Sequence, residues 1–387
     1  MNIGIITDGY IDWNGGLDFL KIVMRGLDSR ENTKLFLFFI SENERKYRHV
    51  PVGGKKLLEK LLPYKQNSSI SNFSEFKNAE IVNYRMSNID RKIKEYDIDV
   101  IFPSMIDLGK NMPVKWCLEL FDCQHKYFPQ YFSIIRRKYR DIFYKRAMSH
   151  ANMVMVNSVV AKNDFSSFYN VDSNKIYSLP LCPTLHKELI GYDNPAITAK
   201  YNIRKPFFII SNQFWVHKAH DIAFMALAKL IQRGYDICIV CTGFMSDYRD
   251  NDHIEYLLRL IKELNIENNV MLLGFIPKKD QIELMKESLG VIQPSRYEGD
   301  CSGQVIDAIT VGQRAIVSDI DVCKEVSYID TLSYFKLDDV DDLSKKMISF
   351  VETPYSRPSL ETLYEQEARY KKEFSVYIYC MIERLLA

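Results

Sequence analysis

Short runs of hydrophobic residues alternate with amphipathic segments along nearly the whole chain of 387 residues. The runs are continuous stretches of Val, Ile, Leu and Phe, which is typical of parallel strands covered on both faces by helices. They predict strands at residues 2–7, 35–40, 99–103, 153–157, 206–211, 236–242, 269–273, 291–294 and 314–318. The pattern therefore predicts an α/β fold built on doubly wound parallel sheets.

Helical periodicity fills the segments between these runs. In HDIAFMALAKLIQRGYD the apolar residues recur at helical spacing, and Gly234 marks the helix end. The tail at residues 360–387 predicts one or two further helices. Residues 41–78 are polar and rich in lysine, and we expect only a short helix there, over the sequence KKLLEKLL.

One stretch without long periodic runs divides the alternating pattern. Residues 180–205 contain three prolines and predict a linker between two domains. A chain of this length exceeds one comfortable core, so two domains are the expectation. Because open α/β sheets bind ligands outside the carboxyl ends of their strands, we expect the site in the cleft between the domains.

Composition limits the classes of partner. The 51 Lys and Arg residues nearly balance the 50 Asp and Glu residues, so there is no global electrostatic attraction to nucleic acid. No apolar run approaches the ~18 residues needed to span a bilayer. The first residues, MNIGIITDGY, lack the basic segment and cleavage site of a signal peptide, and the eight cysteines are scattered. These features predict a cytoplasmic protein.

Two strand-to-helix loops carry candidates for phosphate binding. Gly15 and Gly16 allow close approach to the backbone, before a helix N-terminus that favours negative charge. Two glycines also fit a simple tight turn, and the sequence has neither GxGxxG nor GxxxxGK[ST]. Lys218 lies between a strand and a helix, where an ammonium suits a phosphate, although a surface lysine is the simpler interpretation.

A histidine and a basic segment form a third candidate. His125 follows a strand-like run, where it can donate a hydrogen bond into the cleft, but a lone histidine is more often structural. The following residues 131–146 mix aromatic, isoleucine and basic side chains. Such a segment fits an anionic membrane surface or lipid headgroup, and it fits an ordinary solvated helix face equally well.

The fourth candidate is the stretch SRYEGDCSGQVIDAITVGQRAIVSD. Glu298 begins a loop of small residues, Gly299 and Gly303 free its backbone, and Asp307 falls in the first turns of the following helix. Carboxylates accept paired hydrogen bonds from sugar diols, and free amides hold phosphate, so the loop suits a nucleotide-sugar. An N-capping loop would explain the glycines but not Glu298.

Together these loops resemble the retaining glycosyltransferases of family four, which have the GT-B fold. VIQPSRYEGDCSGQVIDAITVGQRAIVSDI is similar to the family segment PS-x-x-EG-x-G-x-x-x-x-EA-x-x-x-G-x-P-VI-x-SD. SNQFWVHKAH resembles the donor-phosphate loop, LLGFIPKKDQIELMKES the segment that contacts the base, and WNGGLDFLKIVMRGL the glycine loop. DCQHKYFPQYFS and NSVVAKNDFSSFY look typical of members in bacterial surface-polysaccharide pathways.

The resemblance implies the domains and the site. Residues 1–190 would form an acceptor-binding domain, 191–360 a nucleotide-sugar-binding domain, and 361–387 a helical segment packing back toward the first domain. It implies catalytic roles for Glu298 on the sugar hydroxyls, His125 on the sugar and Lys218 on the diphosphate. The implied donor-binding residues are Gly15, Gly16, Gln213, Lys218, Phe275, Ile276, Glu298, Gly299, Asp300, Cys301, Ser302, Gly303 and Asp307.

The implied reaction transfers a sugar, with retention, from a nucleotide-sugar to a saccharide or lipid-linked saccharide in O-antigen or capsule synthesis. Such front-face chemistry depends on positioning and charge stabilisation and needs no cofactor and no obligatory metal. The residues themselves, apart from the resemblance, predict a cytoplasmic location and no nucleic-acid partner. The basic segment 131–146 and the lysines near residues 55–65 predict peripheral contact with the anionic inner face of the plasma membrane.

Two departures from the family pattern leave alternatives open. Glu298 and Asp307 are nine residues apart where the family has eight, and Gln213 stands where the family has an arginine. Arg296 or Arg249 would then supply the missing charge. The alternatives are a sugar-nucleotide 2-epimerase, which would need an acid/base pair around the sugar, and a non-catalytic binding or scaffold subunit.

Overall fold

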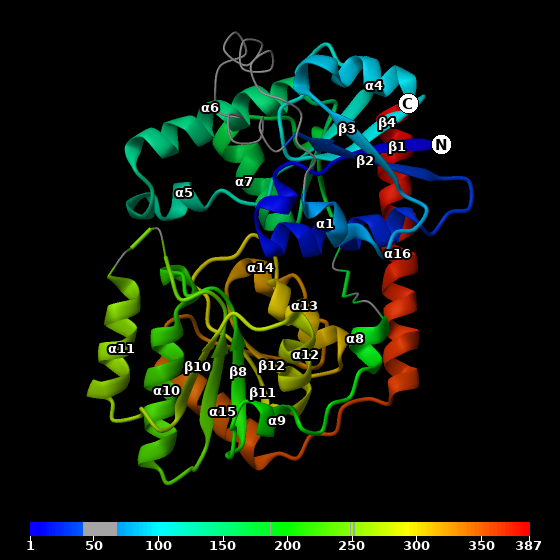
Figure 1. The fold of residues 1–387 in the computed structure, drawn as a ribbon. Helices are drawn as coiled ribbons and strands as arrows, with labels where there is room; N and C mark the ends of the chain where they lie inside the picture. The colour runs from blue at the N-terminus through cyan, green and yellow to red at the C-terminus, as the bar shows by residue number, and fades with distance from the viewer. Residues whose placement is uncertain (42–67, 181, 184, 186, 248, 251) are drawn as a thin grey trace.

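The computed structural model in Figure 1 describes residues 1–41, 68–180, 182–183, 185, 187–247, 249–250 and 252–387. The described residues form two parallel sheets, one of seven strands and one of six, with helices packed on both faces of each. The predicted fold class, two Rossmann-like doubly wound domains facing each other, is confirmed. The expected helix over KKLLEKLL lies outside the described residues.

The seven-stranded sheet has the order β3-β2-β1-β4-β5-β6-β7. Its strands are β1 (Asn2–Ile6), β2 (Lys34–Ile40), β3 (Glu80–Tyr84), β4 (Val100–Ser104), β5 (Lys115–Glu119), β6 (Met153–Val156) and β7 (Ile176–Ser178). Around it pack α1 (Asn14–Leu27), α4 (Ile89–Glu95), α5 (Gln124–Tyr127), α6 (Ile134–His150) and α7 (Val159–Tyr169). Short 3-10 turns are η1 (Tyr10–Asp12), η2 (Ser68–Phe73), η3 (Met86–Asn88), η4 (Pro129–Tyr131) and η5 (Ser173–Lys175).

The six-stranded sheet has the order β10-β9-β8-β11-β12-β13. Its strands are β8 (Phe207–Ser211), β9 (Cys238–Thr242), β10 (Val270–Gly274), β11 (Gly290–Gln293), β12 (Ala315–Ser318) and β13 (Leu332–Phe335). Its helices are η6 (Val216–Lys218), α10 (His220–Gln232), α11 (His253–Glu263), α12 (Lys278–Glu287), α13 (Gly303–Thr310), α14 (Asp321–Lys324) and α15 (Val340–Glu352). Two short helices, α8 (Lys187–Gly191) and α9 (Ile197–Lys200), lie in the connection between the sheets.

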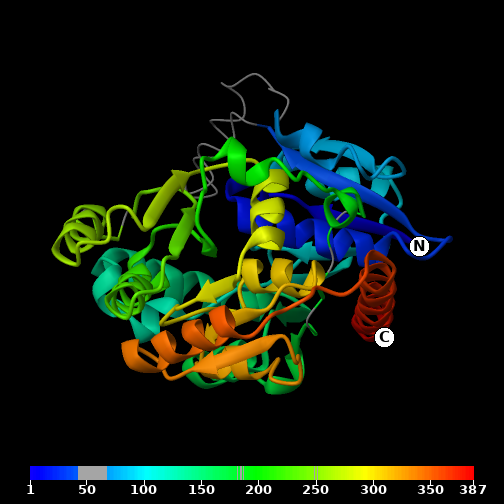
Figure 2. The ribbon, with the colours of Figure 1, turned by 90° about the horizontal axis from the view of Figure 1, so that it is seen from below.

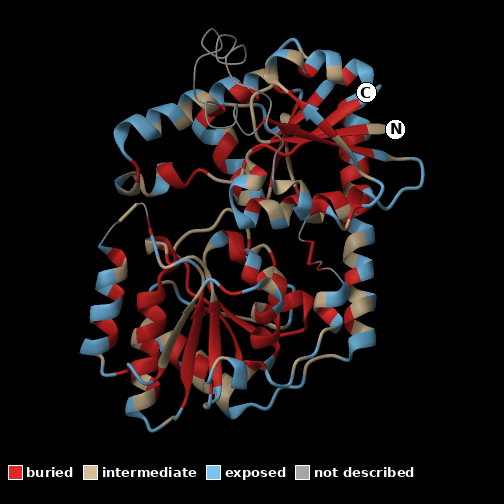
Figure 3. Cartoon of the chain, in the orientation of Figure 1, coloured by how far each residue is buried: buried red, intermediate tan, exposed pale blue. Residues whose placement is uncertain are grey.

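All nine strands predicted from hydrophobic runs are present, and four others were not predicted. Three of these four, β3, β7 and β13, lie at sheet edges, where strands are only partly covered and carry polar residues. The fourth, β5, is an inner strand whose charged ends, Lys115 and Glu119, interrupt its apolar run. Figure 3 shows the consequence of the doubly wound arrangement, with buried residues concentrated in the two sheets.

The tail forms one helix, α16 (Leu360–Leu386), that belongs to the cores of both domains. Leu363, near its start, packs in the core beside the six-stranded sheet, whereas Phe374 and Ile378 pack in the core beside the seven-stranded sheet. Tyr379 donates a hydrogen bond to the carbonyl of Leu27 in α1, at 2.6 Å. Figures 1 and 2 show α16 along one side of the molecule, next to both domains. The boundary drawn near residue 190 stays a prediction.

The order of the strands determines where the segments with candidate site residues lie. In each sheet the chain reverses direction of winding between the first strand and the fourth, that is between β1 and β4 and between β8 and β11. Such switch points open a crevice at the carboxyl ends of the strands. The segments after β1, β8 and β11 therefore lie at the crevices. They lead to Gly15 in the first turn of α1, Lys218 at the end of η6 and Glu298 in the loop before α13.

Candidate functional site

Lys218 and Glu298 meet at the switch point of the six-stranded sheet. Lys218 ends the 3-10 turn after β8, and Glu298 lies in the loop after the neighbouring strand β11. The Lys218 Nζ donates to Oε1 and Oε2 of Glu298 at 2.6 and 2.9 Å. Both side chains are 9% exposed, so the pair is largely shielded from water. The switch point thus holds an ammonium that can neutralise phosphate beside a carboxylate that can accept hydrogen bonds from hydroxyls.

Gln293 fixes the orientation of Glu298. It is the last residue of β11 and is fully buried. Its Nε2 donates to Glu298 Oε1 and to Ser295 Oγ, both at 2.6 Å, while its Oε1 accepts from Asn212 Nδ2 at 2.9 Å. Sequence reasoning did not select Gln293. The signal was an amide at the end of a predicted buried strand, a position that faces the crevice.

The loop from Glu298 to Gly303 is held against the first domain. The carbonyl of Gly299 accepts from Ser158 Oγ at 2.9 Å, and a Cβ on Gly299 would lie 2.7 Å from the carbonyl oxygen of Phe121. Glycine is required here because the loop after β5 approaches so closely. Ser302, with φ of 76°, precedes α13, whereas the Cα of Gly303 faces open space. Cys301 is buried in the hydrophobic core, so only its backbone is free to meet a ligand.

Three carboxyl groups converge on this contact. Asp300 accepts from the backbone amide of Ser302 at 2.7 Å; burial and the nearby Glu298 carboxylate raise the Asp300 pKa to about 6. Across the domain contact, burial raises the pKa of Glu119 well above its usual range, and the charge of Asp300 raises it further. Glu119 Oε2 accepts from Tyr10, and its Oε1 is buried without a partner among the described residues. Glu119 was missed because a lone acid ending β5 carries no distinctive pattern.

Gly15 and Gly16 lie in the first turn of α1, under the indole of Trp13. A Cβ on Gly15 would come within 2.3 Å of the indole ring, and one on Gly16 within 2.6 Å of the indole nitrogen. The indole is 42% exposed and packs edge-on against Phe121, with ring centroids 5.3 Å apart. The glycines therefore make room for Trp13, whose indole occupies the space beside the backbone where the donor was predicted to approach.

The remaining donor residues after β8 and β10 form a separate group. Gln213 Oε1 accepts from the backbone amide of Phe244 at 3.2 Å, so its side chain orders the loop after β9. Phe275 stacks on Phe244 with centroids 4.7 Å apart, and both rings are about half exposed. Ile276 is buried in the core, which leaves its backbone for contact. A half-exposed aromatic pair offers a flat apolar face.

Asp307 is paired within the protein. Its carboxylate lies 2.5 Å from Lys278 Nζ, and the same ammonium is 3.5 Å from Asp18 of α1 in the first domain. Asp307 is buried, and burial raises its pKa, against the opposing effect of Lys278. Any hydroxyl that Asp307 accepts from would have to share the carboxylate with Lys278.

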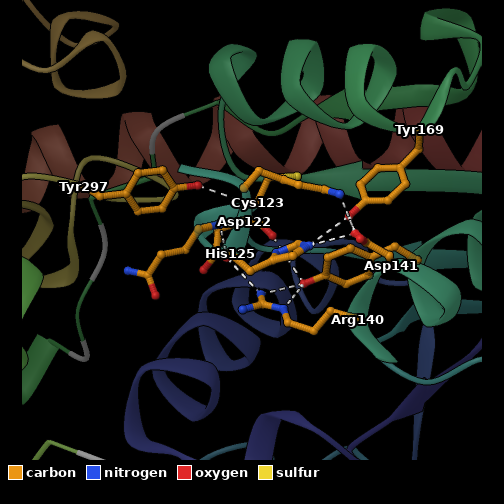
Figure 4. Close-up of polar contacts among 10 residues, drawn as sticks. Asp122, Cys123, His125, Arg140, Asp141, Tyr169 and Tyr297 are labelled. Carbon is orange, nitrogen blue, oxygen red and sulfur yellow. Dashed lines mark hydrogen bonds and ion pairs between the residues drawn. The ribbon is translucent and has the colours of Figure 1, made fainter. Parts of the chain in front are cut away.

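His125 is buried in the first domain and faces α6 and α7 (Figure 4). Its Nε2 lies 2.9 Å from Asp141 Oδ1 and 3.1 Å from the Tyr169 hydroxyl. Burial lowers the pKa of His125, so the ring is neutral near pH 7 and donates from Nε2 to Asp141. Its Nδ1 is buried without a partner among the described residues, and it is an acceptor in this tautomer. The expectation that His125 donates into the cleft therefore does not match this geometry.

Neither arginine proposed to replace the missing charge is available in this state. Arg296 donates to Asp221 at 3.0 Å and to Asp338 at 2.7 Å. Arg249 pairs with Asp247 at 3.3 Å and lies over the ring of Trp215. Lys218 is thus the cation that the structure places against Glu298.

The structure brings some of the predicted residues together and not others. Lys218, Glu298, Asp300 and the backbone of residues 299–303 form one contact region at the domain interface. Tyr297 strengthens that interface by accepting from the backbone amide of Cys123 at 3.1 Å (Figure 4). A hollow of about 420 Å³ lies elsewhere, between α16, Lys187 of α8 and the residues Ser29 and Arg30 that follow α1.

Comparison with known proteins agrees with the two-domain fold. Residues 193–370, just under half of the chain, match the family described as glycosyl transferases group 1. Among solved structures, Anabaena HepE in complex with UDP superposes with a TM-score of 0.66 at 15% identity, covering 100% of this chain and 99% of that one. Sucrose-phosphate synthase from Thermosynechococcus elongatus superposes at 0.67 with 13% identity and the same coverage. The chain has the GT-B fold.

Two curated relatives match only part of this chain. Protein CapJ of Staphylococcus aureus is 28% identical over 143 residues, 35% of this chain and 34% of CapJ. The O-antigen chain mannosyltransferase RfbU of Salmonella typhimurium is 23% identical over 209 residues, 54% of this chain and 53% of RfbU. The matches span about a third and about half of the lengths of these relatives.

Proposed function

We propose that the protein is a retaining glycosyltransferase that moves a sugar from a nucleotide-sugar to a saccharide or lipid-linked saccharide acceptor. The proposal rests on one observation above all, the buried pair of Lys218 and Glu298 at the switch point of the six-stranded sheet. That pair lies inside the segment that matches glycosyl transferases group 1. It offers the two chemistries that a nucleotide-sugar needs, a cation for diphosphate and a carboxylate for hydroxyls.

In the proposed reaction the acceptor hydroxyl attacks C1 of the donor sugar from the face that the phosphate leaves. The bond from C1 to the phosphate oxygen breaks, the bond from C1 to the acceptor oxygen forms, and the hydroxyl proton passes to the leaving diphosphate. Lys218 stabilises the charge on the leaving diphosphate, and Glu298, oriented by Gln293, holds the sugar hydroxyls. The reaction requires no cofactor and no obligatory metal.

Named relatives support the class of donor and the pathway. Neighbouring GT-B structures are complexes with UDP and with UDP-glucose, which supports a nucleotide-sugar donor. RfbU is an O-antigen chain mannosyltransferase, which supports a role in O-antigen or capsule synthesis. We infer that the first domain binds the acceptor, because the second carries the group 1 segment.

A ligand panel followed by a transfer assay tests the proposal. A UDP-sugar or GDP-sugar present at ~100 times its dissociation constant should stabilise the fold by ~2.7 kcal/mol, which a thermal-shift measurement detects. The stabilising donor is then incubated with saccharide acceptors, with and without EDTA, and the anomeric configuration of the product is read by NMR. A product with inverted configuration would overturn the retaining mechanism, and loss of activity in EDTA would overturn metal independence.

The same panel separates the alternatives. A non-catalytic binding subunit, favoured by the glutamine at position 213, would be stabilised by a nucleotide-sugar without forming product. A sugar-nucleotide 2-epimerase would change the donor itself in the absence of any acceptor, and NMR of the recovered donor shows this. No stabilisation by any member of the panel would count against all three functions.

A further inference from the structure

The outer face of α6 is unusually apolar for a solvent-exposed helix. Ile135 and Ile142, seven residues apart and hence on one side of the helix, are 82% and 66% exposed. Ile134 and Tyr139 extend this apolar surface and are 63% and 52% exposed. Isolated exposed apolar residues need no explanation, but four on one helix face form a patch. Figure 3 shows the outer side of α6 as a mostly exposed strip.

The same face is basic and carries no acid. The other exposed residues of α6 are Arg136, Lys138, Lys145, Arg146 and Ser149. The helix has a single acidic residue, Asp141, and it is turned inward to His125, Lys126 and Tyr169. Arg146 pairs with Asp107 of the first domain, yet 61% of its side chain stays exposed. We call the exposed residues 134–136, 138–139, 142, 145–146 and 149 the α6 face.

The opposite side of α6 contacts the loop after β5. Arg140 donates to Asp122 at 2.9 Å, in the loop after β5 that approaches Gly299. Phe132, two residues before α6, lies beneath the guanidinium of Arg249 from the second domain, 5.9 Å from the ring centroid. The α6 face therefore belongs to a helix whose inner side contacts the loop after β5, the loop that approaches Gly299 of the candidate site.

We propose that the α6 face docks on an anionic lipid surface. Isoleucines flanked by lysine and arginine, without acids, match the boundary between acyl chains and negatively charged headgroups. The cations complement negatively charged headgroups, and the exposed isoleucines can be buried among the acyl chains. Docking through α6 holds the first domain, which we infer to bind the acceptor, at the lipid surface, within reach of molecules held in the membrane. That consequence, a lipid-linked acceptor, rests on the proposed function, whereas the docking itself does not.

Vesicle flotation of the full chain tests the docking. The wild-type protein should float with vesicles of phosphatidylcholine and phosphatidylglycerol and not with phosphatidylcholine alone. Ile135→Glu/Ile142→Glu should abolish flotation, because the acids oppose both insertion and charge attraction. Lys138→Gln/Lys145→Gln should lower partition on the order of tenfold or more, since each cation near an anionic surface contributes several-fold. Raising the salt concentration should weaken binding of the wild type.

Controls separate the possible outcomes. Val376→Glu changes another exposed apolar residue, 55% exposed on α16, and should leave flotation unchanged. All variants should keep the wild-type melting temperature and the same stabilisation by the nucleotide-sugar. If the wild type fails to float with anionic vesicles, or if Val376→Glu lowers flotation as much as the Ile135/Ile142 variant, the docking proposal is overturned. Failure of the nucleotide-sugar panel with intact flotation would instead overturn the proposed function alone.

Discussion

The Lys218 ammonium donates to both carboxylate oxygens of Glu298, at 2.6 and 2.9 Å, with both side chains largely buried. The group expected to bind phosphate is thus paired with the group expected to bind sugar. A diphosphate must compete with Glu298 for Lys218, and a sugar whose hydroxyls donate to Glu298 in place of Lys218 releases the ammonium. Binding of the donor therefore requires the ion pair of Lys218 and Glu298 to separate.

Substitutions of Lys218 and of Glu298 should have different effects on diphosphate affinity and on turnover. Lys218→Ala removes the cation and should weaken nucleoside-diphosphate binding and also slow transfer. Glu298→Ala leaves the cation without its competitor, so diphosphate affinity should not fall, while turnover falls by ~10²-fold or more through lost positioning. Calorimetry with the free diphosphate and a transfer assay measure the two effects.

Lys229→Ala on α10, which breaks an exposed pair with Asp341 of α15, is the matched control and should change neither property. If Glu298→Ala turned over normally, the catalytic role of the pair would be wrong, and the loop after β11 would only cap α13.

Asp300 should give the fold a measurable dependence on pH. Burial, followed by the Glu298 charge, raises its pKa to about 6, above the ~3.9 of an unfolded aspartate. Between these values the native state holds a proton that the unfolded chain has released. The contribution of Asp300 is therefore most favourable below the unfolded pKa and is lost as the pH rises through about 6.

Asp300→Asn keeps an oxygen to accept from the Ser302 amide and removes the charge. Relative to wild type, its melting temperature should rise more at about pH 7.5 than at about pH 5. Asp321→Asn, at an exposed position, serves as the control and should show no such difference. An equal effect of Asp300→Asn at both pH values would show that Asp300 is ionised throughout this range.

Hydrophobic runs were sufficient to predict the two sheets because buried parallel strands are apolar on both faces. They were insufficient at the edges, where β13 mixes exposure and burial, and in β5, which ends in the buried acid Glu119. The positions of Lys218 and Glu298 followed from a general rule, since both come directly after neighbouring strands at a switch point. Their mutual ion pair did not follow, because the residues are eighty positions apart.

Trp13 shows why the glycine loop was interpreted incompletely. The sequence indicated a flexible backbone at Gly15 and Gly16 but not which atoms use the space. The side-chain orientation of Trp13 depends on Phe121, more than a hundred residues away, with ring centroids 5.3 Å apart. Contacts of this kind are set by tertiary packing and leave no local pattern in the sequence.

Trp13→Ala should strengthen binding of a nucleoside diphosphate. The indole covers the first turn of α1, so a ligand that reaches those amides must displace it from Phe121. An aromatic pair is worth about 0.5–1.5 kcal/mol, so its removal should raise affinity by roughly twofold to tenfold. Calorimetry measures the change, and Trp13→Phe, which keeps an aromatic ring, should show a smaller one. A fall in affinity would mean that the indole itself contacts the ligand.

Nucleotide-binding measurements can distinguish two roles for Asp307, binding of the ribose hydroxyls and contact between the two domains. It lies 2.5 Å from Lys278, which also reaches Asp18 across the domain interface, and this arrangement fits either of two roles. If Asp307 accepts from the ribose hydroxyls, the protein should bind a ribonucleoside diphosphate more tightly than its 2′-deoxy analogue. A hydrogen bond to a charged group contributes about 1.5–3 kcal/mol, which corresponds to a preference on the order of tenfold to a hundredfold.

Asp307→Asn should then abolish most of this preference, because a neutral amide is a weaker acceptor. Lys278→Ala should weaken it as well, because the Asp307 pKa, already raised by burial, rises further without the opposing ammonium. Gln281→Ala, which removes a neutral neighbour 3.5 Å from the same carboxylate, is the control and should retain the preference. Competition calorimetry with the two nucleotides, beside thermal unfolding of each variant, separates the roles. If Asp307→Asn and Lys278→Ala both unfold at lower temperature while the ribose preference survives, Asp307 joins the two domains through Lys278 and does not bind the donor.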